Sequence, residues 1–212
     1  MAPWSDAHLI VHLRRALHPL PDRIPAVPAG MMPAVVLVPL EWVAQRAQWD
    51  LILIQRSERL PLHRGQMAFP GGMIEPHDRT LVDAVLREVE EEIGLSRERI
   101  EPAGILPPTA TVTRFWVWPI VARVVPPWRP RLNPEEVQAL VRVPLYHFLQ
   151  AHHHEWRSVE FRGHVHRVHN FAYGKYAIWG ATARMIVHLL HVVASIYGLD
   201  ISWLEDPENH AS

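Results

Sequence analysis

Three glutamates, Glu88, Glu91 and Glu92, lie within about one helical turn of one another. Carboxylates three and four positions apart on a helix are neighbours and repel one another. A divalent cation removes this repulsion, and Mg²⁺ prefers oxygen ligands. The nearby glycine turn, which ends at Gly72, lets a backbone carbonyl approach closely. We therefore interpret these residues as a metal site with Gly72 as a backbone ligand. The alternative is a solvated acidic helix face.

The glutamates belong to a helix that the sequence predicts over residues 78–93. Its apolar residues recur at helical spacing and form one stripe, which comprises Val82, Val85, Leu86, Val89 and Ile93. At about 100 degrees per residue, Glu88 and Glu92 fall together beside this stripe, with Glu91 next to them. Glu90 falls on the opposite flank and is left out of the site. Arg87 precedes Glu91 by four residues, so its guanidinium can hold a carboxylate in place.

The rest of the chain mixes strands and helices, which predicts an α/β layered domain. Short apolar runs predict strands at residues 34–40, 51–54, 104–106 and 115–121. Helices are expected at residues 5–17, 144–149 and 178–197, and a hairpin across residues 159–173. We divide the chain into an N-terminal helix with a proline-rich connector (1–33), a main domain (34–200) and a C-terminal tail (201–212). The N-terminal segment packs either on the domain or on a second copy, which leaves a homodimer open.

The composition excludes several classes of function. A formal net charge of −1 provides no basic field for non-specific nucleic-acid binding. The absence of cysteine excludes disulfides, thiolate metal sites and cysteine nucleophiles. Charged residues interrupt residues 1–20, unlike a signal peptide, and the longest apolar runs look too short or too interrupted to span a bilayer. We therefore expect a cytoplasmic protein that binds neither nucleic acid nor membranes.

The glutamate segment resembles the Nudix box, the loop–helix–loop signature of the Nudix hydrolase family. Gly72, Asp78 and residues 87–95 follow the order and spacing of that box with two departures. Asp78 stands where the family has a glutamate, and one extra residue separates it from Arg87. The resemblance implies a Nudix-type α/β/α sandwich with a mixed central sheet, to which the N-terminal helix is an addition.

The two departures are typical of the coenzyme A pyrophosphatase branch of this family. The branch also carries a motif before the box, and residues 52–57 and 65–72 are similar to it, with isoleucine at 52 and 54 replacing a leucine and a threonine. Residues 104–108, 143–145 and 179–183 also resemble this branch. The resemblance therefore spans about residues 34–190, most of the chain.

The resemblance implies metal-dependent hydrolysis of coenzyme A or acyl-coenzyme A at its pyrophosphate. The products would be 4′-phosphopantetheine, or its acyl form, and adenosine 3′,5′-bisphosphate. The implied cofactor is Mg²⁺ or Mn²⁺, which neutralises a diphosphate and activates an attacking water. By position, Glu88, Glu91 and Glu92 would be metal ligands, and Arg87 would support the helix carboxylates.

Further residues outside the box are candidates for the site. Family members place the general base variably, and Glu136 is our choice, although residues 135 and 136 could equally begin a helix. Arginine suits bidentate contact with phosphate. The candidates for substrate contact lie in or beside the upstream motif and are Arg56, Arg59, His63 and Arg64. For Arg56 the alternative is an ion pair at the end of a strand.

Two other functions remain open. One is a Nudix hydrolase that acts on ADP-ribose, a dinucleotide or a nucleoside triphosphate. The other, of a different class, is a non-catalytic Nudix-fold binding module, which we would expect to have degenerate box carboxylates. The intact Glu88, Glu91 and Glu92 favour an enzyme.

Overall fold

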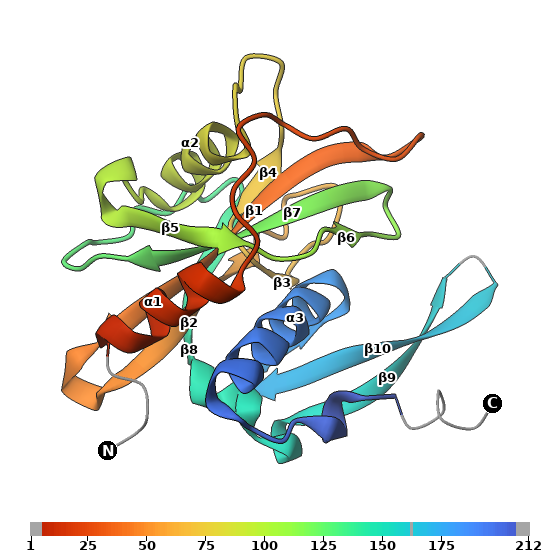
Figure 1. Ribbon diagram of the computed structural model, residues 1–212. Coiled ribbons are helices and arrows are strands. Elements are labelled where there is room, and N and C mark those ends of the chain that lie inside the picture. The colour runs from red at the N-terminus through yellow and green to blue at the C-terminus, as the bar shows by residue number, and fades with distance from the viewer. Residues whose placement is uncertain (1–5, 162, 207–212) are drawn as a thin grey trace.

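The computed structural model describes residues 6–161 and 163–206, which form a layered α/β structure (Figure 1). The central sheet has eight strands, namely β1 (Met32–Val43), β2 (Gln48–Arg56), β3 (Met67–Ala68), β4 (Gly71–Met73), β5 (Ile100–Ile105), β6 (Thr109–Ala110), β7 (Phe115–Val124) and β8 (Val137–Pro144). The strand order is β3-β2-β1-β7-β5, with β4 paired to β1, β6 to β7 and β8 to β2. β1 and β7 are parallel and the other pairs are antiparallel, so the sheet is mixed.

Helices cover both faces of this sheet. They are α1 (Asp6–Ala16), α2 (Leu81–Ile93) and α3 (Gly180–Tyr197), with short 3₁₀ turns η1 (Ala44–Arg46), η2 (Arg97–Arg99), η3 (Leu145–Leu149), η4 (Ala151–His153) and η5 (Ser202–Leu204). α2 lies on one side, whereas α1 and α3 lie on the other (Figure 1). The expected α/β/α sandwich is therefore confirmed.

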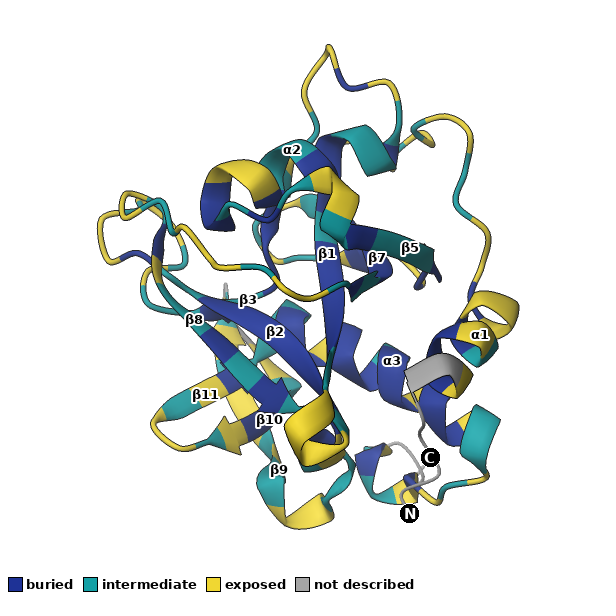
Figure 2. Cartoon of the chain, turned by 90° about the vertical axis from the view of Figure 1, so that its left-hand side faces the viewer, coloured by how far each residue is buried: buried dark blue, intermediate teal, exposed yellow. Residues whose placement is uncertain are grey.

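Alternation along the strands divides the core between the two faces. In β2, Leu51 and Leu53 pack with α1 and α3, whereas Ile52 and Ile54 pack with α2. Successive side chains of a strand point to opposite faces, so an unbroken apolar run is required when both faces are covered. Figure 2 shows the resulting buried strands in the middle of the molecule.

A second, three-stranded sheet packs beside α3. Its strands are β9 (His154–Phe161), β10 (His164–Tyr173) and β11 (Tyr176–Trp179), in the order β11-β10-β9. The expected hairpin is present, although its first strand begins five residues before 159, at His154. Residue 162, at the turn of the hairpin, lies outside the described residues.

The structure corrects several predicted boundaries. The helix predicted at 78–93 begins at Leu81, because the Thr80 side chain accepts the N–H of Asp83 and caps it. The helix predicted at 178–197 begins at Gly180, since β11 precedes it. Strand β8 was not predicted, and residues 145–149 form a 3₁₀ turn rather than an α-helix. In β8, Val137, Ala139, Val141 and Val143 recur at every second position, a strand signal that the sequence analysis overlooked, whereas the five residues of the 3₁₀ turn are too few to show a period.

The N-terminal helix is part of the core. α1 contacts α3 and β5, and the side chains of Leu9 and Leu13 are fully buried there. The predicted start at residue 5 lies outside the described residues. In the described part of the chain, α1 thus packs on its own domain.

One described helix has the length and composition of a membrane span. α3 reaches a mean hydropathy of 1.2 over 18 residues, and half of that window is buried inside the fold. By length and composition this helix passes a test that the apolar runs, expected to be too short or too interrupted, were not expected to pass. Because its buried residues join the core beside α1 and the second sheet, α3 is a core helix of this fold.

Removing a buried side chain of α1 should destabilise the whole domain. We expect Leu13→Ala to lower the free energy of unfolding by about 2–5 kcal/mol, the usual cost of a buried leucine truncation. Val11, in the same helix, is 43% exposed, and Val11→Ala should change it by less than about 0.5 kcal/mol. Urea unfolding followed by circular dichroism measures both, and equal effects would show that α1 does not contribute to the core as described.

Candidate active site

The turn at residues 70–72 brings backbone into contact with the end of α2. Gly71 has a φ of +145°, and a Cβ there would lie 2.3 Å from the carbonyl oxygen of Val35. Conformation and space therefore both require glycine. The N–H of Gly71 donates to Oε2 of Glu92 over 2.8 Å. This turn is thus fixed between β1 and the glutamate helix.

α2 presents Glu88 and Glu92 to that turn. Its stripe of buried apolar residues packs toward the sheet, and Gly94 ends the helix in a left-handed conformation. A Cβ at Gly72 would lie 2.5 Å from Cδ of Glu88. The Gly72 backbone therefore lies directly against the Glu88 carboxylate, where the sequence predicted a backbone ligand.

The Glu92 carboxylate is buried, with only 2% of the residue exposed. This burial raises its pKa to about 8. The hydrogen bond from Gly71 and the nearby charge of Arg56 lower the pKa, whereas the negative charges of Glu88 and Glu136 raise it further. Negative charge at this position is thus incompletely compensated by the protein itself.

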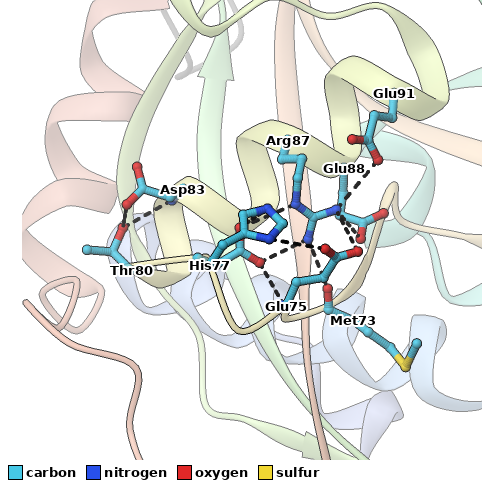
Figure 3. A network of polar contacts seen from close by, with 9 residues as sticks. Met73, Glu75, His77, Thr80, Asp83, Arg87, Glu88 and Glu91 are labelled. Carbon is cyan, nitrogen blue, oxygen red and sulfur yellow. Dashed lines mark hydrogen bonds and ion pairs between the residues drawn. The ribbon is translucent and has the colours of Figure 1, made fainter.

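Arg87 neutralises part of the cluster (Figure 3). Its Nη1 donates to Oε1 of Glu88 over 2.9 Å and lies 3.5 Å from Oε2 of Glu91. Burial raises the pKa of Glu88, the hydrogen bond from Arg87 opposes this, and the pKa stays above its ordinary value. Arg87 therefore contacts the helix carboxylates as the sequence predicted.

Asp78 holds the other side of the Arg87 guanidinium. Nε and Nη2 of Arg87 donate to the two oxygens of Asp78 over 3.3 and 2.9 Å, and Nη2 also donates to the Met73 carbonyl over 3.1 Å. Burial raises the pKa of Asp78, but the hydrogen bonds from Arg87 and from the N–H of Glu75 outweigh it and lower the pKa. The bond to Asp78 in turn raises the pKa of Arg87, so the pair is charged. Sequence reasoning placed Asp78 in the motif without assigning it this contact.

The donors fit a divalent cation, although they are not arranged around one point. Glu91 is exposed at 58% of its side chain and is held by Arg87. Among residues 6–161 and 163–206, no three acidic or histidine side chains converge on a position for a metal ion. Carboxylates of Glu88 and Glu92 beside the Gly72 backbone are nevertheless the oxygen donors that Mg²⁺ and Mn²⁺ accept.

Glu136 lies near the half-buried Glu88 and the buried Glu92. Its charge raises the pKa of both Glu88 and Glu92, although burial has the larger effect on each. The alternative that residues 135 and 136 begin a helix is wrong, because residues 134–136 form a turn before β8. Glu135 points elsewhere and pairs with Arg59.

Asn133 is a contact residue that sequence reasoning missed. Its N–H donates to the carbonyl of Glu92 over 2.9 Å, and its Nδ2 donates to Oε1 of Glu136 over 3.4 Å. An asparagine before a proline often starts a turn, and that signal could have drawn attention to residues 133 and 134.

The four residues predicted to contact substrate are placed differently. Arg56 ends β2 close enough to Glu92 to lower its pKa, and its buried Nε has no hydrogen-bond partner in the described part of the chain. Arg59 is exposed and pairs with Glu135. His63 bonds Gln66 and Thr113 over 3.0 and 3.3 Å, and Arg64 is exposed. Only Arg56 is thereby brought to the carboxylates.

Comparison with known proteins decides the family. The sequence model of the NUDIX domain matches residues 31–162. The chain belongs to the Nudix family. A relative named uncharacterized Nudix hydrolase NudL, from Klebsiella pneumoniae subsp. pneumoniae, is 40% identical over 156 residues, or 74% of this chain and 80% of the relative. A homologue with the same name from Salmonella paratyphi B is 40% identical over 158 residues, with the same coverage.

Solved Nudix structures have the same fold. A Nudix hydrolase from M. smegmatis, RenU, matches 84% of this chain and 94% of its own with a TM-score of 0.54 and 16% identity. A MutT/nudix family protein from Enterococcus faecalis matches 91% and 71% with a TM-score of 0.51 and 18% identity. At these identities the likeness concerns the fold alone. Family membership makes this Nudix protein a hydrolase of phosphorus anhydrides, in a family that generally uses Mg²⁺ or Mn²⁺.

The buried Glu92 should make the metal-free Nudix domain less stable at high pH. Its folded-state pKa of about 8 exceeds its ordinary value of 4.5. The stability that protonation provides is therefore complete below the unfolded-state pKa and is lost as the pH rises through the folded-state pKa. We expect the free energy of unfolding in EDTA to fall between about pH 5 and about pH 8.5, and to fall less in Glu92→Gln.

Urea titrations at several pH values measure this difference. Glu90→Gln, an exposed change of the same kind on the same helix, is the control and should keep the pH dependence of the parent. If the parent and Glu92→Gln have the same pH dependence, Glu92 is not the buried group described above.

Proposed function

We propose that this Nudix hydrolase cleaves the pyrophosphate of coenzyme A or acyl-coenzyme A. The products would be 4′-phosphopantetheine, or its acyl form, and adenosine 3′,5′-bisphosphate. The contact between Asp78 and Arg87 is the observation that carries this proposal. Asp78 differs from the family pattern in type and spacing, yet it reaches the Arg87 guanidinium with two hydrogen bonds. This contact supports the proposal, because the Asp78–Arg87 spacing that is typical of the coenzyme A branch still lets the two side chains form an ion pair.

The chain offers residues for each task of such a hydrolysis. Glu88, Glu91, Glu92 and the Gly72 carbonyl would hold Mg²⁺ or Mn²⁺. When bound, the cation neutralises the diphosphate and makes its phosphorus more electrophilic. Arg87 keeps the Glu88 carboxylate oriented, and Asp78 keeps Arg87 in place.

Proton transfer and substrate contact would fall to residues around the cluster. Glu136 would accept the proton of the attacking water while the water oxygen bonds to phosphorus and the bond from phosphorus to the bridging oxygen breaks. The unpartnered Nε of Arg56 is suited to a phosphate oxygen. Arg59, His63 and Arg64 lie in or at the end of the loop that follows β2 and would contact more distant parts of the substrate.

A substrate panel tests the assignment. Purified protein with Mg²⁺ or Mn²⁺ is incubated with coenzyme A, ADP-ribose, NADH and dinucleoside polyphosphates, and the products are separated by chromatography. We expect coenzyme A to give 4′-phosphopantetheine and adenosine 3′,5′-bisphosphate with the highest kcat/KM. Rapid cleavage of ADP-ribose without cleavage of coenzyme A would overturn the substrate, and no cleavage of any compound would favour a binding module.

Arg56→Gln should weaken substrate binding. Loss of one charge-assisted hydrogen bond costs about 1.5–3 kcal/mol, so we expect KM for coenzyme A to rise about tenfold or more. Arg129→Gln, an exposed change in the loop before residue 133, is the control and should leave KM unchanged. Steady-state kinetics measure both variants, and an unchanged KM in Arg56→Gln would remove Arg56 from the substrate site.

A further inference from the structure

We propose that Asn133 is a positioning residue, which holds the Glu136 carboxylate beside Glu88 and Glu92. This inference rests on the proposed function, in which Glu136 is the general base. Asn133 belongs to the segment between β7 and β8 and lies outside the Nudix box. Its role would be to hold the Glu136 side chain at a fixed position relative to the C-terminal end of α2.

The backbone of Asn133 attaches this segment to α2. The last carbonyls of a helix have no partner within the helix. The N–H of Asn133 donates to the carbonyl of Glu92 over 2.9 Å, and the N–H of Arg131 donates to the carbonyl of Ile93 over the same distance. The segment therefore takes its position from the same helix end that carries a proposed metal ligand.

The side chain of Asn133 uses both ends of its amide. Oδ1 accepts the N–H of Glu135 over 3.1 Å and thereby shapes the turn. Nδ2 donates to Oε1 of Glu136 over 3.4 Å. Only a side-chain amide offers an acceptor and a donor together at this length, whereas an ionised aspartate offers acceptors alone. Asn133→Asp would keep the turn and lose the contact with the base.

The hydrogen bond from Asn133 to Glu136 holds this carboxylate beside two other acidic side chains. The Glu136 carboxylate lies close enough to Glu88 and Glu92 to raise the pKa of both, so the three acidic side chains crowd one another. Glu136 is half-buried, so without a donor its side chain can rotate toward water at little cost. The Asn133 amide offsets that tendency by its hydrogen bond to Oε1 of Glu136.

Other contacts hold the Glu136 backbone independently of the Asn133 side chain. The N–H of Ser57 donates to the carbonyl of Glu136 over 2.8 Å. The carbonyl of Asn133, which any residue would supply, accepts the N–H groups of Glu136 and Val137 over 3.1 and 2.8 Å. A change of the amide should therefore affect the Glu136 side chain more than the fold.

The test compares Asn133→Asp, Glu136→Gln and the double variant with coenzyme A and Mg²⁺, or with ADP-ribose if the panel identifies it as the better substrate. We expect Asn133→Asp to lower kcat about 10- to 100-fold, part of the usual contribution of a general base, with KM within about twofold. Its melting temperature in EDTA should stay close to that of the parent. Gln138→Glu, the same amide-to-acid change at an exposed position of β8, should keep the parent kcat.

The double variant separates positioning from a merely structural role. If Asn133 acts through Glu136, the double variant should be no slower than Glu136→Gln alone, because residues that act together are not additive. A further loss in the double variant, or a parental kcat in Asn133→Asp, would overturn the positioning role. A parental kcat in Glu136→Gln would instead show that the proposed base is wrong. A large fall in melting temperature with Asn133→Asp would assign Asn133 to the fold.

Discussion

The site depends on a buried carboxylate that the chain does not fully neutralise. Glu92 is almost completely buried at the end of α2, where the N–H of Gly71 donates to its carboxylate and Glu88 and Glu136 add negative charge. Burying an uncompensated charge is costly. Without a cation, Glu92 therefore keeps its proton up to about pH 8. Its surroundings are rigid, with a glycine turn that tolerates no side chain on one side and a helix capped at both ends on the other. Such an arrangement is what a cation site requires before the cation arrives.

Arg87 limits the charge of the cluster without removing it. Its guanidinium contacts Glu88 and Glu91 on the helix (Figure 3). It also donates to Asp78 on the preceding loop. Because Asp78 is buried and takes two of the hydrogen bonds, Arg87 is fixed at the outer side of the cluster. Glu92 is left for the inner side, next to Arg56 and Glu136. The helix thus separates outer carboxylates that Arg87 neutralises from the inner Glu92, which keeps its proton up to about pH 8 when no cation is bound.

Much of this arrangement could be predicted from the sequence, because it follows from local periodicity. The apolar stripe of α2 placed Glu88 and Glu92 together, and the unbroken apolar runs identified the strands at residues 34–40 and 51–54. Contacts between distant segments could not be predicted in this way. Asn133 contacts Glu92 across 41 positions of sequence, so that contact was not apparent. β8 differs, because its alternating valines carried a strand signal that was overlooked. Arg59 and Arg64 were predicted to contact substrate because they lie near a motif in the sequence, but the fold does not bring them to the carboxylates. The predicted division into 1–33, 34–200 and 201–212 stays a prediction.

The central claim is that the inner carboxylates bind a divalent cation, and electron paramagnetic resonance of Mn²⁺ tests it most directly. Free Mn²⁺ gives a six-line spectrum that weakens when the ion is bound by a protein. When Mn²⁺ is added to an equimolar amount of the parent protein, previously stripped with EDTA and dialysed, the six-line signal of free Mn²⁺ should weaken. The double variant Glu88→Gln and Glu92→Gln should leave the signal of free Mn²⁺ intact. Equal loss of signal with both proteins, or no loss with the parent, would contradict the account.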